Sequence, residues 1–344
     1  MYILAFESSC DETSAAVLEM DAGTRAIRAN LVASQIAVHR LYGGVVPEIA
    51  SRAHIEAITA LTRDALAEAG CGLADIGAVG VTASPGLIGA LLVGVNFAKS
   101  LAYANNIPLV PVNHIRAHVA AALLAHPDLE PPFLALVVSG GHTTLYAVDD
   151  YVTYRLLGGT RDDAAGEAFD KIGRVIGLPY PGGAAMDKLA AFGNPGAVKL
   201  PSPALPGENL DFSFSGLKTA ALNYLNAEAQ RGDPIAAAPD HLAPGRAADL
   251  AAAYTDTIVR AIVKKTGHAL QQTGLRTLVL AGGVAANSHL RAGLAALCAK
   301  RGARLCMPPL ALCGDNAAMV GAQAYYEYCA GVRADTSLNA SACD

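Results

Sequence analysis

Two histidines that could share a metal ion, His114 and His118, lie four residues apart in the segment NHIRAH. In a helix this spacing places both imidazoles on one face, where they can bind the same ion. The alternative is that both are ordinary polar residues of an Ala-rich helix. A third ligand would favour the metal. Asp315 is the candidate, because it precedes a helical segment after the proline-rich stretch 307–309, although there it could simply cap the helix.

Two imidazoles and one carboxylate leave open coordination positions, which suits Fe(II), Zn or Mn and could accept phosphate oxygens of a nucleotide. A metalloprotease would also use paired histidines. Its HExxH pattern needs a Glu directly after the first His, and Ile115 stands there instead. The sequence therefore lacks the base of a hydrolytic site at this helix.

Two short polar turns follow apolar strands. Ser139, Gly140 and Gly141 form a turn with few side-chain atoms, so their backbone amides could approach an anion, although the segment could be only a turn. The earlier turn carries the adjacent acids Asp11 and Glu12. These acids are suited to proton handling or to binding metal-bound water, unless both are simply solvated.

Three further segments are candidate ligand sites. Asp170 lies inside a helical segment with an acidic start, where no cap is needed, so it is a ligand-binding candidate. Asp187 follows the turn at 180–183 and could hold ribose hydroxyls or start a helix. The glycine turn 282–287 lies between a strand and a helix, where free amides favour phosphate or adenosine. No GxxxxGK[ST] loop is present, and no GxGxxG follows a strand.

The elements that position these residues show a repeat. The segments ILAFESSCDETSAAVLEM and LALVVSGGHTTLYAV share a pattern of strand, polar turn and strand, which predicts two hairpins opening two related lobes. A helix is expected over 47–69, between Pro47 and Gly70. Further helices are expected over 114–126, 163–176 and 247–273, with strands over 78–82, 109–113 and 277–280 and an irregular segment over 200–216. Strands and helices thus alternate, as in α/β folds. The duplicated hairpins, together with the glycine turn before a late helix, resemble the actin, heat-shock-protein 70 and sugar-kinase superfamily.

The composition limits the class of protein. A length of 344 residues suits two domains, and 53% hydrophobic with 16% charged residues predicts a compact globular chain. The sequence has no run near the roughly 20 apolar residues of a membrane span, so we expect no membrane association. The start lacks the pattern of a secretory signal, and seven cysteines without a CxxC pair indicate reduced thiols, both consistent with the cytoplasm. A net charge of −5 requires that any RNA contact be local or shared with partners.

A series of motifs in order, from residue 3 to about residue 320, closely resembles the TsaD family of bacterial tRNA threonylcarbamoyltransferases, once labelled glycoproteases. The motifs are ESSCDETSAAV, VVPEIASRAH, TASPGLIGALLVG, NHIRAH, VVSGGHT, DDAAGEAFDK, YPGG, FSFSGLKTA, GGVAAN and CGDNAAM. Two positions depart from the family pattern. Ala117 replaces the usual Gly before the second histidine, which leaves ligation intact but adds a methyl near the ligand, and Ser8 replaces a Thr and keeps its hydroxyl.

The resemblance implies roles for particular residues. The metal ion would be held by His114, His118 and Asp315, and Fe(2+) is the ion that the family implies. The adenylate substrate would be held by Val137, Val138, Ser139, Gly140, Gly141, Asp170, Gly183, Asp187 and Asn287. Asp11 or Glu12 is our hypothesis for the proton acceptor.

The resemblance also implies the reaction. The threonylcarbamoyl group would pass from L-threonylcarbamoyladenylate to the exocyclic amine of the adenosine 3' of the anticodon, in tRNAs reading codons that begin with A, with release of AMP. TsaB-like and TsaE-like proteins would be partners. The expected fold has two actin-like α/β lobes, 1–110 plus 315–344 and 111–314, with a nucleotide cleft between them. The alternative function is an ATP-dependent small-molecule kinase or a chaperone-like ATPase of the same superfamily.

Overall fold

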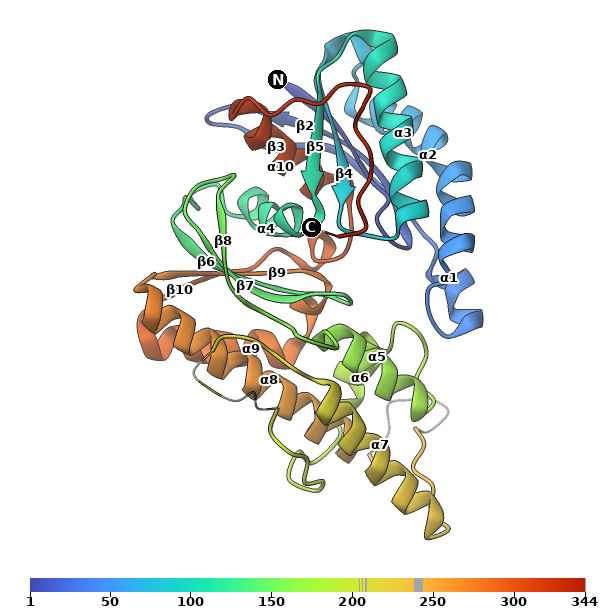
Figure 1. The fold of residues 1–344 in the computed structure, drawn as a ribbon, viewed down its shortest axis with the longest axis vertical. Coiled ribbons are helices and arrows are strands. Elements are labelled where there is room, and N and C mark those ends of the chain that lie inside the picture. Colours follow the sequence, from blue (N-terminus) through green and yellow to red (C-terminus); the bar gives the residue numbers. More distant parts are fainter. Residues whose placement is uncertain (204, 206, 208, 238–243, 344) are drawn as a thin grey trace. The chain divides into compact units, whose positions relative to one another are not determined.

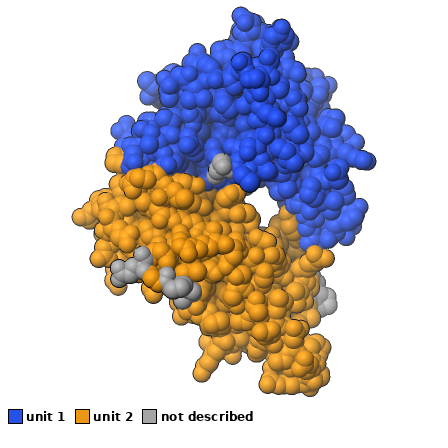
Figure 2. Space-filling model, in the orientation of Figure 1, with its two compact units in different colours: residues 1–131, 148–154, 307–344 blue, residues 132–147, 155–306 orange. Residues whose placement is uncertain are grey.

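The computed structural model describes residues 1–203, 205, 207, 209–237 and 244–343 (Figure 1). The chain divides into two compact units (Figure 2). Unit 1 comprises residues 1–131, 148–154 and 307–344, and unit 2 comprises residues 132–147 and 155–306. No helix in the described ranges is both long and apolar enough to cross a bilayer.

Unit 1 is built on a five-stranded mixed sheet with the order β3-β2-β1-β4-β5. The strands β1 and β2 form the first expected hairpin, in which Phe6 pairs with Ala15, and β4 and β5 run parallel to β1. Both β1 and β2 are buried almost throughout, which explains their continuous apolar sequences. The bounds are β1 (Tyr2–Glu7), β2 (Glu12–Met20), β3 (Arg25–Ser34), β4 (Ile76–Ser84) and β5 (Leu109–Asn113).

Helices cover both faces of this sheet. Adjacent residues of a strand point to opposite faces. On β4, a side chain at Gly80 would meet Ala324 of α10 (Ala317–Cys329), whereas Val81 lies toward Gly94 of α3 (Ile88–Asn105). The helix α2 (Pro47–Ala69) packs on α3 and β2, and α4 (His114–Ala125) packs on α10. The short α1 (Ile36–His39) precedes α2.

Two expected helices can be compared with these elements. The prediction for residues 47–69 is confirmed, with Pro47 as the first residue and Gly70 ending the helix at φ 67°, a left-handed conformation that favours glycine. The helix expected near 114–126 is α4. It belongs to unit 1, although the expected lobe boundary lies before it, so the lobe bounds stay a prediction.

Unit 2 repeats the strand order of unit 1. Its sheet has the order β10-β9-β6-β7-β8, with β9 parallel to both β6 and β10. This correspondence confirms two related α/β units, each opened by a hairpin. The bounds are β6 (Phe133–Val138), β7 (Thr143–Val148), β8 (Tyr154–Gly159), β9 (Thr277–Ala281) and β10 (Arg304–Cys306).

The helices of unit 2 pack on one another and on its sheet. The long α8 contacts β6, α9 and α6, and α5 contacts α6 and α7. The irregular segment expected over 200–216 contains no helix or strand in its described part up to Phe214, apart from an isolated bridge between Phe212 and Thr160, whereas its last two residues already belong to α7. The bounds are α5 (Ala165–Val175), α6 (Gly182–Ala190), α7 (Ser215–Gln230), α8 (Arg246–Thr273) and α9 (Ser288–Arg301).

Candidate functional site

The two histidines are placed by an abrupt change from strand to helix. β5 ends at Asn113, whose side-chain Oδ1 accepts hydrogen bonds from the backbone N–H groups of Ile115 (2.9 Å) and Arg116 (3.0 Å). This cap starts α4 directly at the end of the strand. His114 is therefore the first residue of the helix and His118 lies one turn later. The two residues are 8% and 1% exposed.

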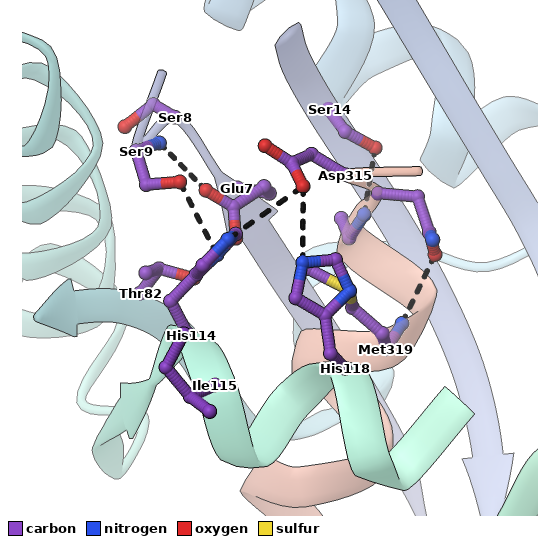
Figure 3. Close-up of polar contacts among 12 residues, drawn as sticks. Glu7, Ser8, Ser9, Ser14, Thr82, His114, Ile115, His118, Asp315 and Met319 are labelled. Carbon is purple, nitrogen blue, oxygen red and sulfur yellow. Dashed lines mark hydrogen bonds and ion pairs between the residues drawn. The ribbon is translucent and has the colours of Figure 1, made fainter. Parts of the chain in front are cut away.

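Asp315 reaches both histidines because its neighbour caps the following helix. Asn316, not Asp315, is the N-cap of α10 and accepts from the N–H of Met319, so the idea that Asp315 caps this helix is wrong. The Asp315 Oδ1 atom lies 3.6 Å from His114 Nε2 and 3.2 Å from His118 Nε2 (Figure 3). The structure thus brings together the three residues that the sequence suggested as metal ligands.

The donor set fits a divalent metal ion. One ligand atom from each of the three residues lies within 4.8 Å of the others. Both ring nitrogens of His118 are buried and have no hydrogen-bond partner among the described residues. Because Nε2 lies 3.2 Å from the Asp315 carboxylate, a cation bound at this place would give both groups a partner. The three side chains therefore form a candidate metal centre that lies entirely within unit 1.

A fourth residue, Glu7, supports this centre and was missed by the sequence analysis. Glu7 is the last residue of β1 and is fully buried. Its Oε2 lies 3.0 Å from His114 Nδ1 and accepts a 2.7 Å hydrogen bond from Thr82, while its Oε1 accepts from the N–H of Ser9 (2.6 Å). Ser9 Oγ also lies 3.2 Å from His114 Nδ1 (Figure 3). These contacts occupy Nδ1 and leave Nε2 facing Asp315.

The charge of Glu7 is favoured by its surroundings. Burial raises the pKa of this carboxyl, but the charge and hydrogen bond of His114 together with the hydrogen bond from Ser9 lower it, and the pKa lies below its ordinary value. A carboxylate behind a ligating histidine is a common arrangement at metal sites, because it orients the ring. The signal in the sequence was an acidic residue at the end of an otherwise apolar strand.

The acids of the first hairpin turn differ in their surroundings. Ser34 Oγ donates to Glu12 Oε1 at 2.8 Å, and Glu12 Oε2 is buried without a hydrogen-bond partner among the described residues. Burial raises the pKa of Glu12 to about 7, although the bond from Ser34 acts in the opposite direction. The backbone carbonyl of Asp11 accepts from the N–H of Gln35 (3.0 Å). Of the two acids, Glu12 is thus placed to exchange a proton near neutral pH.

In unit 2, the second hairpin turn is attached to the start of α5. The carbonyls of Ser139 and Gly140 accept from the N–H groups of Gly166 and Glu167, both at 3.2 Å. A side chain at Gly166 would collide with the Ser139 carbonyl. Gly140 and Gly141 are exposed, and an added Cβ at either would meet no atom within 4 Å. The turn therefore presents backbone groups to open space.

The same turn is packed against the glycine turn after β9. Gly282 has φ 91°, and a Cβ there would collide with the carbonyl of Val138, the last residue of β6. Both the left-handed backbone and the close approach require glycine at this position. Val137 lies beside Val138 in β6 and pairs with Ala281 in β9. These contacts hold the ends of β6 and β9 together.

Three other predicted residues connect the helices of unit 2. Asp170 Oδ1 accepts from the N–H of Gly183 (2.8 Å), which joins α5 to α6. Asp187 accepts from the N–H of Ser288 (3.0 Å) and contacts His289 Nδ1 (2.9 Å), which joins α6 to the start of α9.

Asn287 caps α9 by accepting from the N–H of Leu290 (2.8 Å). The predicted substrate residues therefore form one connected set in unit 2, and Ser288 and His289 are members that the sequence did not suggest.

Comparison with known proteins identifies the family. The sequence model described as TsaD, tRNA N6-adenosine threonylcarbamoyltransferase, matches residues 26–322. A Clostridium botulinum (strain 657 / Type Ba4) protein of that name is 50% identical over 98% of this chain and 96% of its own length. Its counterpart in Moorella thermoacetica is 52% identical over 98% of this chain and 95% of its own length.

Solved structures support the fold. Full-length HypF in a phosphate- and nucleotide-bound form has a TM-score of 0.62 at 15% identity, covering 100% of this chain and 47% of HypF. Component A of the (R)-2-hydroxyglutaryl-CoA dehydratase of Acidaminococcus fermentans has a TM-score of 0.53 at 14% identity, covering 96% of this chain and 99% of that protein. These likenesses show that the chain shares the overall α/β fold of these two proteins.

Proposed function

The chain belongs to the TsaD family of tRNA N6-adenosine threonylcarbamoyltransferases, and from this premise we propose the reaction that it performs and the residues that perform it. The threonylcarbamoyl group is transferred from L-threonylcarbamoyladenylate to the exocyclic amine of the adenosine 3' of the anticodon, in tRNAs reading codons that begin with A. AMP is released. The observation that carries the proposal is the buried centre formed by His114, His118 and Asp315 in a chain with this family match.

The centre holds one divalent ion, which we propose to be Fe(2+), with Zn or Mn also suited to the donor set. When bound, such an ion supplies positive charge that can stabilise a phosphate oxygen. The protein's own contribution is orientation. Glu7 fixes the ring of His114 through Nδ1, which leaves Nε2 on the side of Asp315, where it would be available to hold the ion.

The adenylate is held in unit 2. The exposed turn at Gly140 and Gly141 offers backbone amides to the acyl-phosphate group, in keeping with its open surroundings. Asp170 and Asp187 act partly by fixing the N-terminal ends of α6 and α9, because their carboxylates accept backbone N–H groups there. The full proposed set is Val137, Val138, Ser139, Gly140, Gly141, Asp170, Gly183, Asp187 and Asn287.

The transfer step needs a proton acceptor. The adenosine amine nitrogen forms a bond to the carbamoyl carbon, the bond from that carbon to the phosphate oxygen breaks, and one amine proton must leave. We assign this proton to Glu12, with Asp11 as the neighbouring alternative. The support is the pKa of Glu12 of about 7, which lets the carboxylate form accept a proton near neutral pH.

TsaB-like and TsaE-like proteins are proposed partners for transfer to tRNA. The support from this chain is its net charge of −5, because phosphate neutralisation by Lys and Arg supplies most non-specific RNA affinity. Partners could supply part of the missing positive surface.

The test is reconstitution from purified components. The chain, its two proposed partners, L-threonylcarbamoyladenylate and an unmodified tRNA are mixed, and modified nucleoside and AMP are quantified by mass spectrometry. We expect equal amounts of both products, loss of both after chelation, and recovery with a divalent metal. A reaction that instead consumes ATP and phosphorylates a metabolite, with no tRNA product, would support the kinase alternative and contradict the proposal.

A further inference from the structure

A cavity of about 770 Å³ lies within unit 2, and its lining contains none of the proposed substrate residues. One wall is the C-terminal half of α8, and the other is the irregular segment before α7, including Asn209, Asp211 and Phe212. In Figure 1 this segment runs beside α8. Lys265 of α8 joins the two walls, because its Nζ donates to the backbone carbonyl of Asn209 and lies 3.3 Å from the side-chain oxygen of the same residue.

The α8 wall is rich in basic residues. Arg260, Lys264 and His268 are spaced by four residues and so lie on one face of the helix, where Lys265 adds a further amine. Asp211 is the sole carboxylate among the described residues that line the cavity. It is already paired with Arg161 at 2.5 Å, so it offsets little of this positive charge. A local excess of cations is notable in a chain whose net charge is −5.

The cations of this wall differ in their contacts and in their exposure. Lys265 is bonded to the irregular segment through the carbonyl of Asn209. Burial lowers the pKa of its amine below the ordinary value. Arg260 and Lys264 are exposed, although Arg260 also contacts Asp256 at 2.8 Å. An exposed ion pair of this kind contributes little to stability, so Arg260 can exchange Asp256 for another anion. Lys264 and Arg260 are therefore the cations available to a ligand.

The arrangement fits an extended anion. Residues 260 to 268 rise by about 12 Å along the helix, because each residue of an α-helix rises by about 1.5 Å. Cations spread over that length suit several phosphates of a chain, whereas a single phosphate is usually held by donors that converge. Gln271 and Gln272 extend the wall with amide donors at one end. Phosphodiester backbones are bound through such Lys, Arg and Gln contacts.

We propose that this groove, defined by Arg260, Lys264, Lys265 and His268 with the facing segment 209–214, binds backbone phosphates of the tRNA substrate. The inference rests on the proposed function, because that function supplies the RNA. The groove contacts the tRNA without reading its sequence, since phosphates carry no base information. It adds affinity and takes no part in the chemical step.

The test compares charge variants in the reconstituted reaction. Lys264→Glu and the double variant Arg260→Gln/Lys264→Glu should raise the KM for tRNA by about tenfold or more, and Lys264→Ala should lower the slope of log affinity against log salt by about one. The kcat, the KM for the adenylate and the metal content should stay at parent values. Lys264→Arg should keep tRNA affinity because it keeps the charge. The matched control is Lys300→Glu on α9, an exposed lysine that does not line the cavity.

The outcomes separate this inference from the proposed function. A parent protein that modifies tRNA, with a double variant that has the parent KM and the parent salt slope, overturns the groove alone. An equal loss of tRNA affinity in Lys300→Glu also overturns it, because the effect would then be one of net charge. A parent protein that neither binds nor modifies tRNA under any condition contradicts the proposed function, and the groove assignment with it.

Discussion

The two units have sheets with the same strand order, but the polar ends of these sheets are built differently. In unit 1, polar side chains stand there, with Glu7 as the last residue of β1, the histidines after β5 and Asp315 before α10. In unit 2, the turns after β6 and β9 each contain a pair of glycines and present backbone groups. One fold thus carries a proposed metal centre made of side chains and a proposed substrate site made of main-chain groups.

This difference predicts opposite sensitivities. The centre of unit 1 depends on the identity of each side chain, because its atoms pair at 2.6–3.2 Å. The proposed substrate site of unit 2 depends on the absence of side chains, because a Cβ at Gly166 or Gly282 would overlap a carbonyl. Removing atoms should therefore damage unit 1, and adding atoms should damage unit 2.

The largest effect is expected at His118. His118→Ala should lose the metal ion and slow transfer by about 10⁴-fold or more, because a metal supplies several kcal/mol of charge stabilisation. Metal content by mass spectrometry and single-turnover rates would measure this, with melting temperature as the check on folding. His126→Ala, at the end of the same helix, is the control and should keep its metal. A His118→Ala protein with the metal content of the parent protein would refute the ligand assignment.

The next effect concerns Glu12. Glu12→Gln should slow single-turnover transfer by about 10²- to 10⁴-fold and leave adenylate affinity unchanged. In the parent, the rate should rise as the pH passes about 7, because only the deprotonated carboxylate accepts a proton. That rise should vanish in the variant. Unchanged rates in both Glu12→Gln and Asp11→Asn would mean that the proton leaves to water.

A smaller effect is expected at Glu7, which contacts a metal ligand without being one. Glu7→Gln should weaken metal affinity by about 10- to 100-fold, as is usual for residues that orient a ligating histidine. Metal titration of the chelated protein measures this directly. Glu19→Gln, at a partly exposed acid on β2 that is paired with Arg28, is the control and should bind metal as the parent does. Parent-like affinity in Glu7→Gln would show that the contact with His114 does not position the ring.

The smallest effect is expected when a methyl is added in unit 2. Gly166→Ala should displace the turn at Ser139 and weaken adenosine binding by about tenfold, since overpacking typically costs 1–3 kcal/mol. Gly216→Ala in α7, where an added Cβ would meet no atom within 4 Å, should bind as the parent does. Calorimetric titration with adenosine compares the two. Equal affinity in both variants would argue against a substrate site made of main-chain groups.

The sequence predicted those parts of this picture that depend on local spacing. The pair His114 and His118 follows from helical periodicity, and the bounds of α2 follow from Pro47 and Gly70, whose backbone preferences start and end a helix. The repeated pattern of strand, turn and strand predicted the two related units. Residues identified through family motifs, such as Asp187, lie in the expected region of unit 2.

Other parts of the structure depend on long-range packing and could not be predicted from local sequence patterns. In the sequence, Glu7 shows only as the last residue of a strand. Its role becomes visible because the pairing of β1, β4 and β5 places His114 beside it. The strand β3 escaped notice because nine of its ten residues are at least partly exposed, with no regular alternation of buried and exposed positions. The basic groove requires a glycine- and proline-rich segment to lie against α8, which no local pattern specifies.

The most direct test of the contrast between the units measures two affinities on two variants. Metal binding and adenosine binding are determined for His118→Ala and Gly166→Ala beside the parent chain. We predict that His118→Ala loses metal and keeps parent affinity for adenosine, whereas Gly166→Ala keeps metal and loses about tenfold in adenosine affinity. If each variant loses both ligands, or if the losses are exchanged, the assignment of metal to unit 1 and adenylate to unit 2 is contradicted.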